Sequence, residues 1–267
     1  MKKYRIFFTF IILNLFAINN LTAGWIIVEK KLTPQGLSTH DTIYVQNNKM
    51  RSGGKEASYI YDLNRNRVSI INNFYKTYWT GTPEEYRLGV IEGLKEEIDV
   101  MVAKFPKEKQ KEARENFEAV LMVFDTNDGN PKPEDKVSYK KIVDKTKVLG
   151  YETQRYDFYL KGEKKITIWV SPKIDISRDL DMDKYTKFML KMMNNNPNLS
   201  IKTAPEYAKL IKNAYPLRTI EYLGSQEIVG EVVLVENKRL PESLFTVNQS
   251  FRQLTLPELI RSIRKKN

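Results

Sequence analysis

The chain contains no cysteine among its 267 residues. This absence excludes disulfides, thiol nucleophiles, thiolate metal ligands and a lipid attached to an N-terminal cysteine. Histidine is almost absent too, since His40 is the only one, and it lies beside Asp41 in a polar stretch. A lone histidine in such a stretch is typical of a solvent-exposed turn, so we expect His40 to be a surface residue and not a catalytic base.

Familiar catalytic and cofactor motifs are missing as well. The chain has no G-x-S-x-G nucleophile elbow, no P-loop, no dinucleotide fingerprint and no H-E-x-x-H zinc helix. The acidic cluster at Asp125, Asn127 and Asp128 does not fit a calcium loop, because its glycine comes one position early and no glutamate closes the pattern. We therefore expect no cofactor, no metal and no catalytic residue, and we predict that the protein is not an enzyme.

The first 23 residues have the three parts of a secretory signal peptide. Lys2, Lys3 and Arg5 precede the apolar run Ile6–Ile18, and Leu21-Thr22-Ala23 places small residues at a cleavage site. The apolar run is shorter than the roughly 20 residues that span a bilayer. We expect cleavage near Ala23 and a periplasmic protein; a retained anchor helix is the alternative.

The charge is strongly positive. The formal net charge is +11, and three of these charges lie in the predicted leader, which leaves +8 for the remainder. Such a surface attracts anionic partners, of which an anionic membrane surface is the one we expect. The lysines are scattered and not clustered, which favours an ordinary solvated surface, and we predict no nucleic-acid partner. The sequence identifies no protein partner.

Hydrophobic patterning predicts three groups of strands, with helices inserted between them near 82–125 and 179–215 and a short helix near 257–264. Short β-branched or aromatic runs separated by Gly, Asn and Asp indicate strands near 25–28, 42–45, 58–61, 68–71, 147–151, 154–160, 165–171, 217–223 and 226–235. Capping-box patterns at Thr82 and Thr203 begin two helical segments. The first helix should bury a stripe formed by Tyr86, Val90, Leu94, Ile98, Met101 and Phe105.

These elements predict the fold class and the domain organisation. Strands that follow one another without an intervening helix should pair as an antiparallel meander. We predict one α+β domain over residues 24–267, with a curved antiparallel sheet wrapped over helices that are inserted near 82–125 and 179–215. A strongly curved sheet with helices on its concave side can leave an aromatic-lined slot between the two layers.

Aromatic and methionine side chains are the best candidates for lining that space. Aromatic residues concentrate in the predicted strands, and four methionines lie in the predicted helix at 179–194. Methionine is a flexible apolar residue that adapts to variable ligands. The predicted contacts with ligand are Trp25, Tyr59, Tyr61, Trp79, Trp169, Met189, Met192 and Met193, with Lys49 and Arg51 positioned to meet an anionic headgroup.

Several short stretches resemble a known family when taken in order. They are 42–45 leading to 49–51, 60–64, 76–79, 150–162 and 168–171. Together they resemble an uncharacterised family of exported bacterial proteins, domain of unknown function 4412, which is related to the periplasmic lipoprotein-carrier (LolA-like) fold. The resemblance implies an open half-barrel with an apolar interior. It supplies no catalytic residues.

The leading hypothesis is a non-enzymatic exported protein that holds a lipid-like or amphipathic ligand between sheet and helices. One alternative is an envelope structural or protein-interaction module with a solid core. The other is a carboxylate-dependent hydrolase, because the two carboxylates of such an enzyme can lie far apart in sequence.

Overall fold

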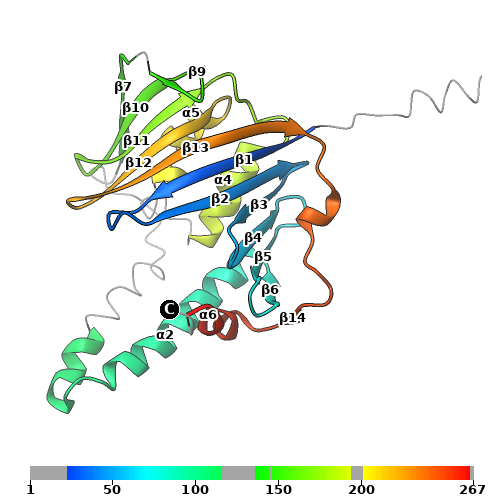
Figure 1. Ribbon diagram of the computed structural model, residues 1–267. Coiled ribbons are helices and arrows are strands. Elements are labelled where there is room, and N and C mark those ends of the chain that lie inside the picture. The colour runs from blue at the N-terminus through cyan, green and yellow to red at the C-terminus, as the bar shows by residue number, and fades with distance from the viewer. Residues whose placement is uncertain (1–22, 116–135, 145, 194–200, 265–267) are drawn as a thin grey trace, which may run out of the picture.

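The structure is a computed structural model that describes residues 23–115, 136–144, 146–193 and 201–264 (Figure 1). Most of the predicted signal peptide, the end of the first helical insertion and the acidic cluster at 125–128 lie outside the described residues. None of the helices in the described ranges is both long and apolar enough to cross a membrane.

A curved twelve-stranded sheet dominates the described residues (Figure 1). Its strands are β1 (Gly24–Leu32), β2 (Ser38–Gln46), β3 (Lys49–Gly53), β4 (Ala57–Asp62), β5 (Arg67–Asn72), β6 (Thr77–Gly81), β7 (Val137–Ile142), β10 (Gln154–Leu160), β11 (Glu163–Ser171), β12 (Tyr215–Leu223), β13 (Gln226–Lys238) and β14 (Arg252–Gln253). The order is β14-β6-β5-β4-β3-β2-β1-β13-β12-β11-β10-β7, and only β14 and β6 are parallel. The predicted α+β class with a curved antiparallel sheet is confirmed; β14 and β7 form its two edges, so the sheet does not close.

The sheet consists of two meanders that meet at one pair of strands. β1 to β6 pair in chain order, and β10 to β13 do the same, with β7 beside β10. β1 then pairs with β13, joining Ile27 to Val235 across about 200 residues of sequence. Local hairpins are readable from turn signals, whereas this long-range pairing is not. A separate small hairpin is formed by β8 (Lys147–Val148) and β9 (Tyr151–Glu152).

The turn between β2 and β3 has a specific backbone requirement. Asn47 and Asn48 both have positive φ, at 53° and 60°. Two consecutive left-handed residues form the type I′ turn that matches the twist of a two-residue hairpin, and asparagine tolerates this conformation. Val45 consequently pairs with Met50 in register.

The helices lie mainly against one face of the sheet, which we call the inner face. They are α2 (Pro83–Val102), α4 (Met182–Met192), α5 (Pro205–Ile211) and α6 (Leu256–Arg264), with 3₁₀ turns η1 (Lys107–Lys109), η4 (Ile201–Thr203) and η5 (Glu242–Phe245). Ile27 and Val45 of the sheet pack with Phe188 of α4 in the main buried cluster. A second cluster joins Ile168 of β11 to Tyr207 of α5. The opposite, outer face is partly covered by the segment around η5, where Phe245 packs with Ile60.

The sequence prediction for α2 is confirmed at the N-terminus of the helix and partly wrong for its buried face. The capping box at Thr82 is present, because Thr82 Oγ1 accepts from the Glu85 amide at 3.1 Å and the Glu85 carboxylate accepts from the Thr82 amide at 2.6 Å. The predicted stripe is partly wrong, since Met101 and Phe105 are exposed. Packing of Gly89 and Gly93 on α6 sets which face of α2 is buried.

The second predicted capping box, at Thr203, is wrong. Thr203 is buried in η4, and α5 begins at Pro205, with Ala204 as its N-cap and no side-chain cap hydrogen bond. The helix ends at Ile211, and Tyr215 already belongs to β12. The Thr203 side chain is therefore buried in η4, and Thr203 is not the N-cap of α5.

Candidate functional site

Strand register brings two rows of side chains to the inner face. Trp25, Val45, Met50 and Tyr61 are consecutive partners across β1 to β4. A parallel row two residues away contains Ile43, Ser52 and Tyr59. Because side chains alternate between the faces of a strand, both rows point toward the helices.

The type I′ turn also positions helix α4 above these rows. The Asn48 amide donates to the Asp179 carbonyl at 2.7 Å, and Asn48 Oδ1 accepts from the Asp181 amide at 2.7 Å. Asp181 is the N-cap of α4, and its side chain accepts from the amides of Asp183 and Lys184. The turn therefore fixes where α4 begins over the sheet.

Between the inner face and the helices lies a cavity of about 610 Å³. Its sheet wall comes from β1 to β4 and the start of β12, and its helical wall comes from residues 176–182, α4, η4 and α5. This volume is within the range of about 300–1,000 Å³ typical of small-molecule sites. The cavity occupies the place where the sequence predicted a slot between sheet and helices.

One end of the cavity is apolar and aromatic. Val45, Met50 and Tyr61 line it from the sheet, and Leu180 and Met182 line it from the helical side. The Tyr61 ring is stacked at 6.3 Å from Tyr59 and lies edge-on at 6.0 Å from Phe188. These contacts fix two tyrosine rings as part of the wall.

The other end of the cavity is charged. Lys31 Nζ lies 2.8 Å from Asp41 Oδ2 and 3.7 Å from Glu29 Oε2. Burial alone would lower the pKa of Lys31, but the hydrogen bond to Asp41 and the charges of both carboxylates outweigh it and raise that pKa. Asp41 lies four residues from Val45 along β2, so the charged and apolar ends are about 13 Å apart.

Three further tyrosines line the cavity from the helical side and from β12. Tyr185 of α4, Tyr207 of α5 and Tyr215 of β12 all line it. Burial raises the pKa of Tyr185 to about 12 and also raises the pKa of Tyr61, Tyr207 and Tyr215. These side chains therefore stay neutral near pH 7 and offer hydroxyls that both donate and accept. No hydrogen bond within the described chain joins the hydroxyls of Tyr185, Tyr207 and Tyr215 to a protein partner.

The comparisons with known proteins place the chain in a family. A family model described as a domain of unknown function (DUF4412) matches residues 99–251. The chain belongs to this DUF4412 family. The matched residues include β7 to β13 with α4 and α5, whereas the earlier stretches of the predicted resemblance, at 42–45, 49–51, 60–64 and 76–79, precede the match.

The remaining comparisons add little to the DUF4412 assignment. The comparison with curated proteins found no match. Among solved structures, one described as "Structure of PNGF-II in C2 space group" is similar at a TM-score of 0.39 and 10% identity, over 91% of this chain and 33% of that chain. This chain thus spans about a third of the length of that one.

Four of the predicted ligand contacts line the cavity of this DUF4412 protein, namely Tyr59, Tyr61, Met189 and Met193. Met192 is buried in the adjacent core. Trp25 and Trp79 belong to the same buried cluster on the inner face, but neither lines the cavity. Trp79 instead packs beside Tyr86 of α2, with ring centroids 6.2 Å apart.

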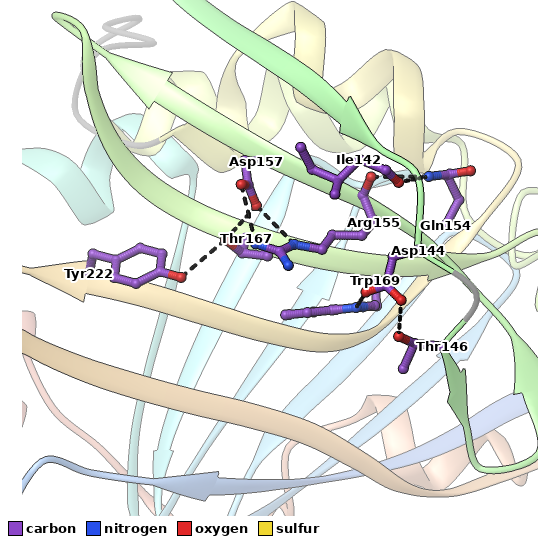
Figure 2. Close-up of polar contacts among 9 residues, drawn as sticks. All are labelled: Ile142, Asp144, Thr146, Gln154, Arg155, Asp157, Thr167, Trp169 and Tyr222. Carbon is purple, nitrogen blue, oxygen red and sulfur yellow. Dashed lines mark hydrogen bonds and ion pairs between the residues drawn. The ribbon is translucent and has the colours of Figure 1, made fainter.

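Strand register places Trp169 on the outer face, beside the polar contacts drawn in Figure 2. It does not line the cavity, although its ring belongs to the same buried cluster as Trp25 and Trp79. The guanidinium groups of Arg155 and Arg218 lie 5.3 Å and 5.1 Å from its ring centroid. Its indole Nε1 donates to Asp144 Oδ2 at 3.3 Å, and hydrogen bonds from Thr146 and then Trp169 lower the pKa of Asp144. Trp169 therefore contacts a polar network through both its ring face and its indole N–H.

This outer-face network continues onto neighbouring strands (Figure 2). Thr167 Oγ1 donates to Asp157 Oδ1 at 2.8 Å, and Arg155 Nε lies 3.2 Å from the same oxygen. Thr167 Oγ1 is also 3.2 Å from the Tyr222 hydroxyl. Asp157 and Thr167 are thus satisfied by neighbouring side chains, whereas the buried Nε atom of Arg218 makes no hydrogen bond within the described residues and lies 3.7 Å from Glu231 Oε2.

The two predicted cationic contacts also lie on the outer face. Lys49 forms an ion pair with Glu242 of η5. Arg51 donates to the Leu244 carbonyl at 3.2 Å and to Ser58 Oγ at 3.1 Å. Neither side chain lines the cavity.

Sequence reasoning missed the charged end of the cavity and its helical tyrosines. The missed lining residues are Glu29, Lys31, Asp41, Tyr185, Lys202, Tyr207 and Tyr215. Strand alternation places Glu29 and Lys31 on the same face as Ile27, and that signal was available in the sequence. Nothing in the sequence indicated that residues 202–215 would reach β1. In the described part of the chain, no group of three acidic or histidine side chains could hold a metal ion.

Proposed function

We propose that this protein binds an amphipathic, lipid-like molecule in the cavity between the sheet and α4. The single observation that carries the proposal is the polarity of the cavity wall. Apolar side chains such as Met50 and Leu180 line one end, and Lys31 with its two carboxylates lines the other. A ligand with a hydrocarbon part and a polar head matches both ends at once.

The size of the cavity also supports small-molecule binding over a solid core. A close-packed protein interior contains few voids larger than a water molecule, whereas the volume of this cavity is about 610 Å³. Met189 and Met193 line its helical wall. Their unbranched side chains can adapt to ligands of different shape. Binding without turnover is the activity these groups support.

The cellular setting is part of the same proposal. Export after cleavage near Ala23 would place the protein among envelope lipids, and its positive charge would favour anionic membrane surfaces. A LolA-like half-barrel would be consistent with the open curved sheet and the cavity on its concave side.

Organic extraction of the purified full-length protein followed by mass spectrometry tests the proposal. We expect a co-purifying lipid-like molecule and binding of a fluorescent fatty acid. Met189→Trp should fill the cavity and weaken that binding at least tenfold, with Met193→Trp as a second filling variant.

Leu88→Trp is the matched control, because Leu88 is exposed on α2 and does not line the cavity. It should bind the fluorescent fatty acid like the parent protein. A folded protein that carries no lipid and does not bind the fatty acid would contradict the proposal. So would equal binding by the parent and by both filling variants.

A further inference from the structure

A second pocket lies on the outer face of β2 to β4 and meets the cavity only at Ser52, Gly53 and Gly54. Its volume is about 450 Å³. Side chains that line it include His40, Thr42, Tyr44, Arg51, Lys55 and Ser58. Register explains the grouping, because Tyr44 pairs with Arg51 and both face away from the helices.

The pocket contains positive charge without compensation. Arg51 and Lys55 supply this charge, the His40 ring lies beside them, and no acidic side chain lines the pocket. Within the described chain, none of these three basic residues forms an ion pair. Nearby basic residues differ in this respect, since Lys31 is paired with Asp41 and Lys49 with Glu242. An uncompensated cluster of this kind attracts an anion.

Arg51 is held in place for such a role. One terminal nitrogen donates to the Leu244 carbonyl and the other to Ser58 Oγ, at 3.2 Å and 3.1 Å. Ser58 is only 3% exposed, so the packing around Ser58 also holds the guanidinium group of Arg51 in place. A guanidinium carries five N–H donors, and two hydrogen bonds leave the others available. An oriented arginine of this kind suits the oxygens of phosphate or sulfate.

The remaining polar groups of the pocket are hydroxyls. Thr42 and Tyr44 each contribute a hydroxyl group, and neither hydroxyl makes a hydrogen bond to another described residue. A hydroxyl can donate to an anionic oxygen. Phosphate and sulfate oxygens are acceptors, so every polar side chain lining the pocket can donate to them.

The geometry points to an oxyanion-binding site in this pocket, with a phosphate or sulfate group as its ligand. The group is carried either by a small soluble ester or by a lipid headgroup, which share this chemistry. The cationic side chains of this site point away from the cavity, although the two pockets share Ser52, Gly53 and Gly54 at the end of β3.

Calorimetric titration of the full-length protein with inorganic phosphate, inorganic sulfate and glycerol 3-phosphate tests the site, and phosphatidylglycerol vesicles test the lipid source. Arg51→Gln should weaken binding at least tenfold. Because Arg51 also anchors η5, the double variant His40→Gln/Lys55→Gln provides a second test that leaves the contact with Leu244 intact. We expect it to weaken binding at least fivefold.

Arg67→Gln is the control, since Arg67 is an exposed residue on the outer face of β5 that does not line the pocket. It removes the same unit charge and should bind like the parent protein. Binding of soluble phosphate or sulfate identifies a soluble ester, and binding of vesicles alone identifies a headgroup. The site is refuted if no probe binds, or if the control loses as much affinity as Arg51→Gln. Met189→Trp should leave phosphate binding unchanged, which separates this test from that of the cavity.

Discussion

At the scale of single residues, Asp179 is the least satisfied buried group near the cavity. Its side chain is 4% exposed, and its Oδ1 atom has no hydrogen-bond partner in the described structure. Burial raises the pKa of Asp179, and contacts from the Asn47 backbone and the Trp25 side chain oppose this effect only in part. The ionised carboxylate therefore costs stability at neutral pH.

Asp179→Asn should stabilise the protein at pH 7 by on the order of 1 kcal/mol. The sign follows from the raised pKa: the protonated form is favoured on folding, so stability is greatest below the unfolded pKa and falls as pH rises through the folded pKa. The gain from the substitution should disappear below about pH 4, where the parent side chain is protonated as well.

Thermal unfolding at pH 7 and at pH 3.5 measures this difference. Asp175→Asn is the control, because Asp175 accepts a hydrogen bond from the Ser177 amide and is only half-buried. It should show no gain that depends on pH in this way. An Asp179→Asn protein that is less stable than the parent at pH 7 would contradict our account of this side chain.

At the scale of elements, two glycines of α2 face α6, and only one of them is required by the close packing. A Cβ atom on Gly89 would lie 2.9 Å from Leu256 Cδ2, which is too close. A Cβ atom on Gly93 would lie 3.6 Å from Ile260 Cδ1, an ordinary packing distance. The two positions therefore differ in whether alanine fits.

Gly93→Ala should stabilise the protein by up to about 1 kcal/mol, because alanine has the higher helix propensity and the site has room for it. Gly89→Ala should gain nothing or lose stability, because Leu256 must move. Urea unfolding of both variants makes the comparison, with each serving as the control for the other. Equal gains at both positions would show that α6 does not pack on α2 as described.

At the scale of the whole molecule, the pairing of β1 with β13 joins the two meanders. Ile27 is fully buried in β1 and pairs with Val235 and Ile43 on its two sides. Ile27→Ala should cost about 2–5 kcal/mol through lost burial and a residual cavity. Because β1 belongs to the first meander and pairs with β13 of the second, we expect both meanders to lose stability together.

Tryptophan fluorescence can follow the two meanders separately. Trp79 reports on β6, and Trp169 reports on β11. In proteins that carry only one of these two tryptophans, with phenylalanine at the other tryptophan positions, Ile27→Ala should shift both urea midpoints equally. A shift in the Trp79 signal alone would indicate two independently folding halves.

The local elements were largely readable from the sequence. The capping box at Thr82 and the strand runs follow from short-range chemistry, in which the groups that interact are neighbours in the chain. For the same reason Tyr59, Tyr61 and Met189 could be predicted to face the space between sheet and helices. The capping pattern at Thr203 failed because burial of that side chain took precedence.

The sequence alone determined the absence of thiol chemistry, the α+β class and the alternation that sorts residues to two faces of a curved sheet. Only the tertiary structure decided which strands meet at β1 and β13, which face Trp169 and Arg51 occupy, and where the cavity has its charged end. These features join residues far apart in the chain, such as Lys31 and Tyr207. Their proximity is set by packing free energy summed over the whole sheet, and no local pattern encodes that sum.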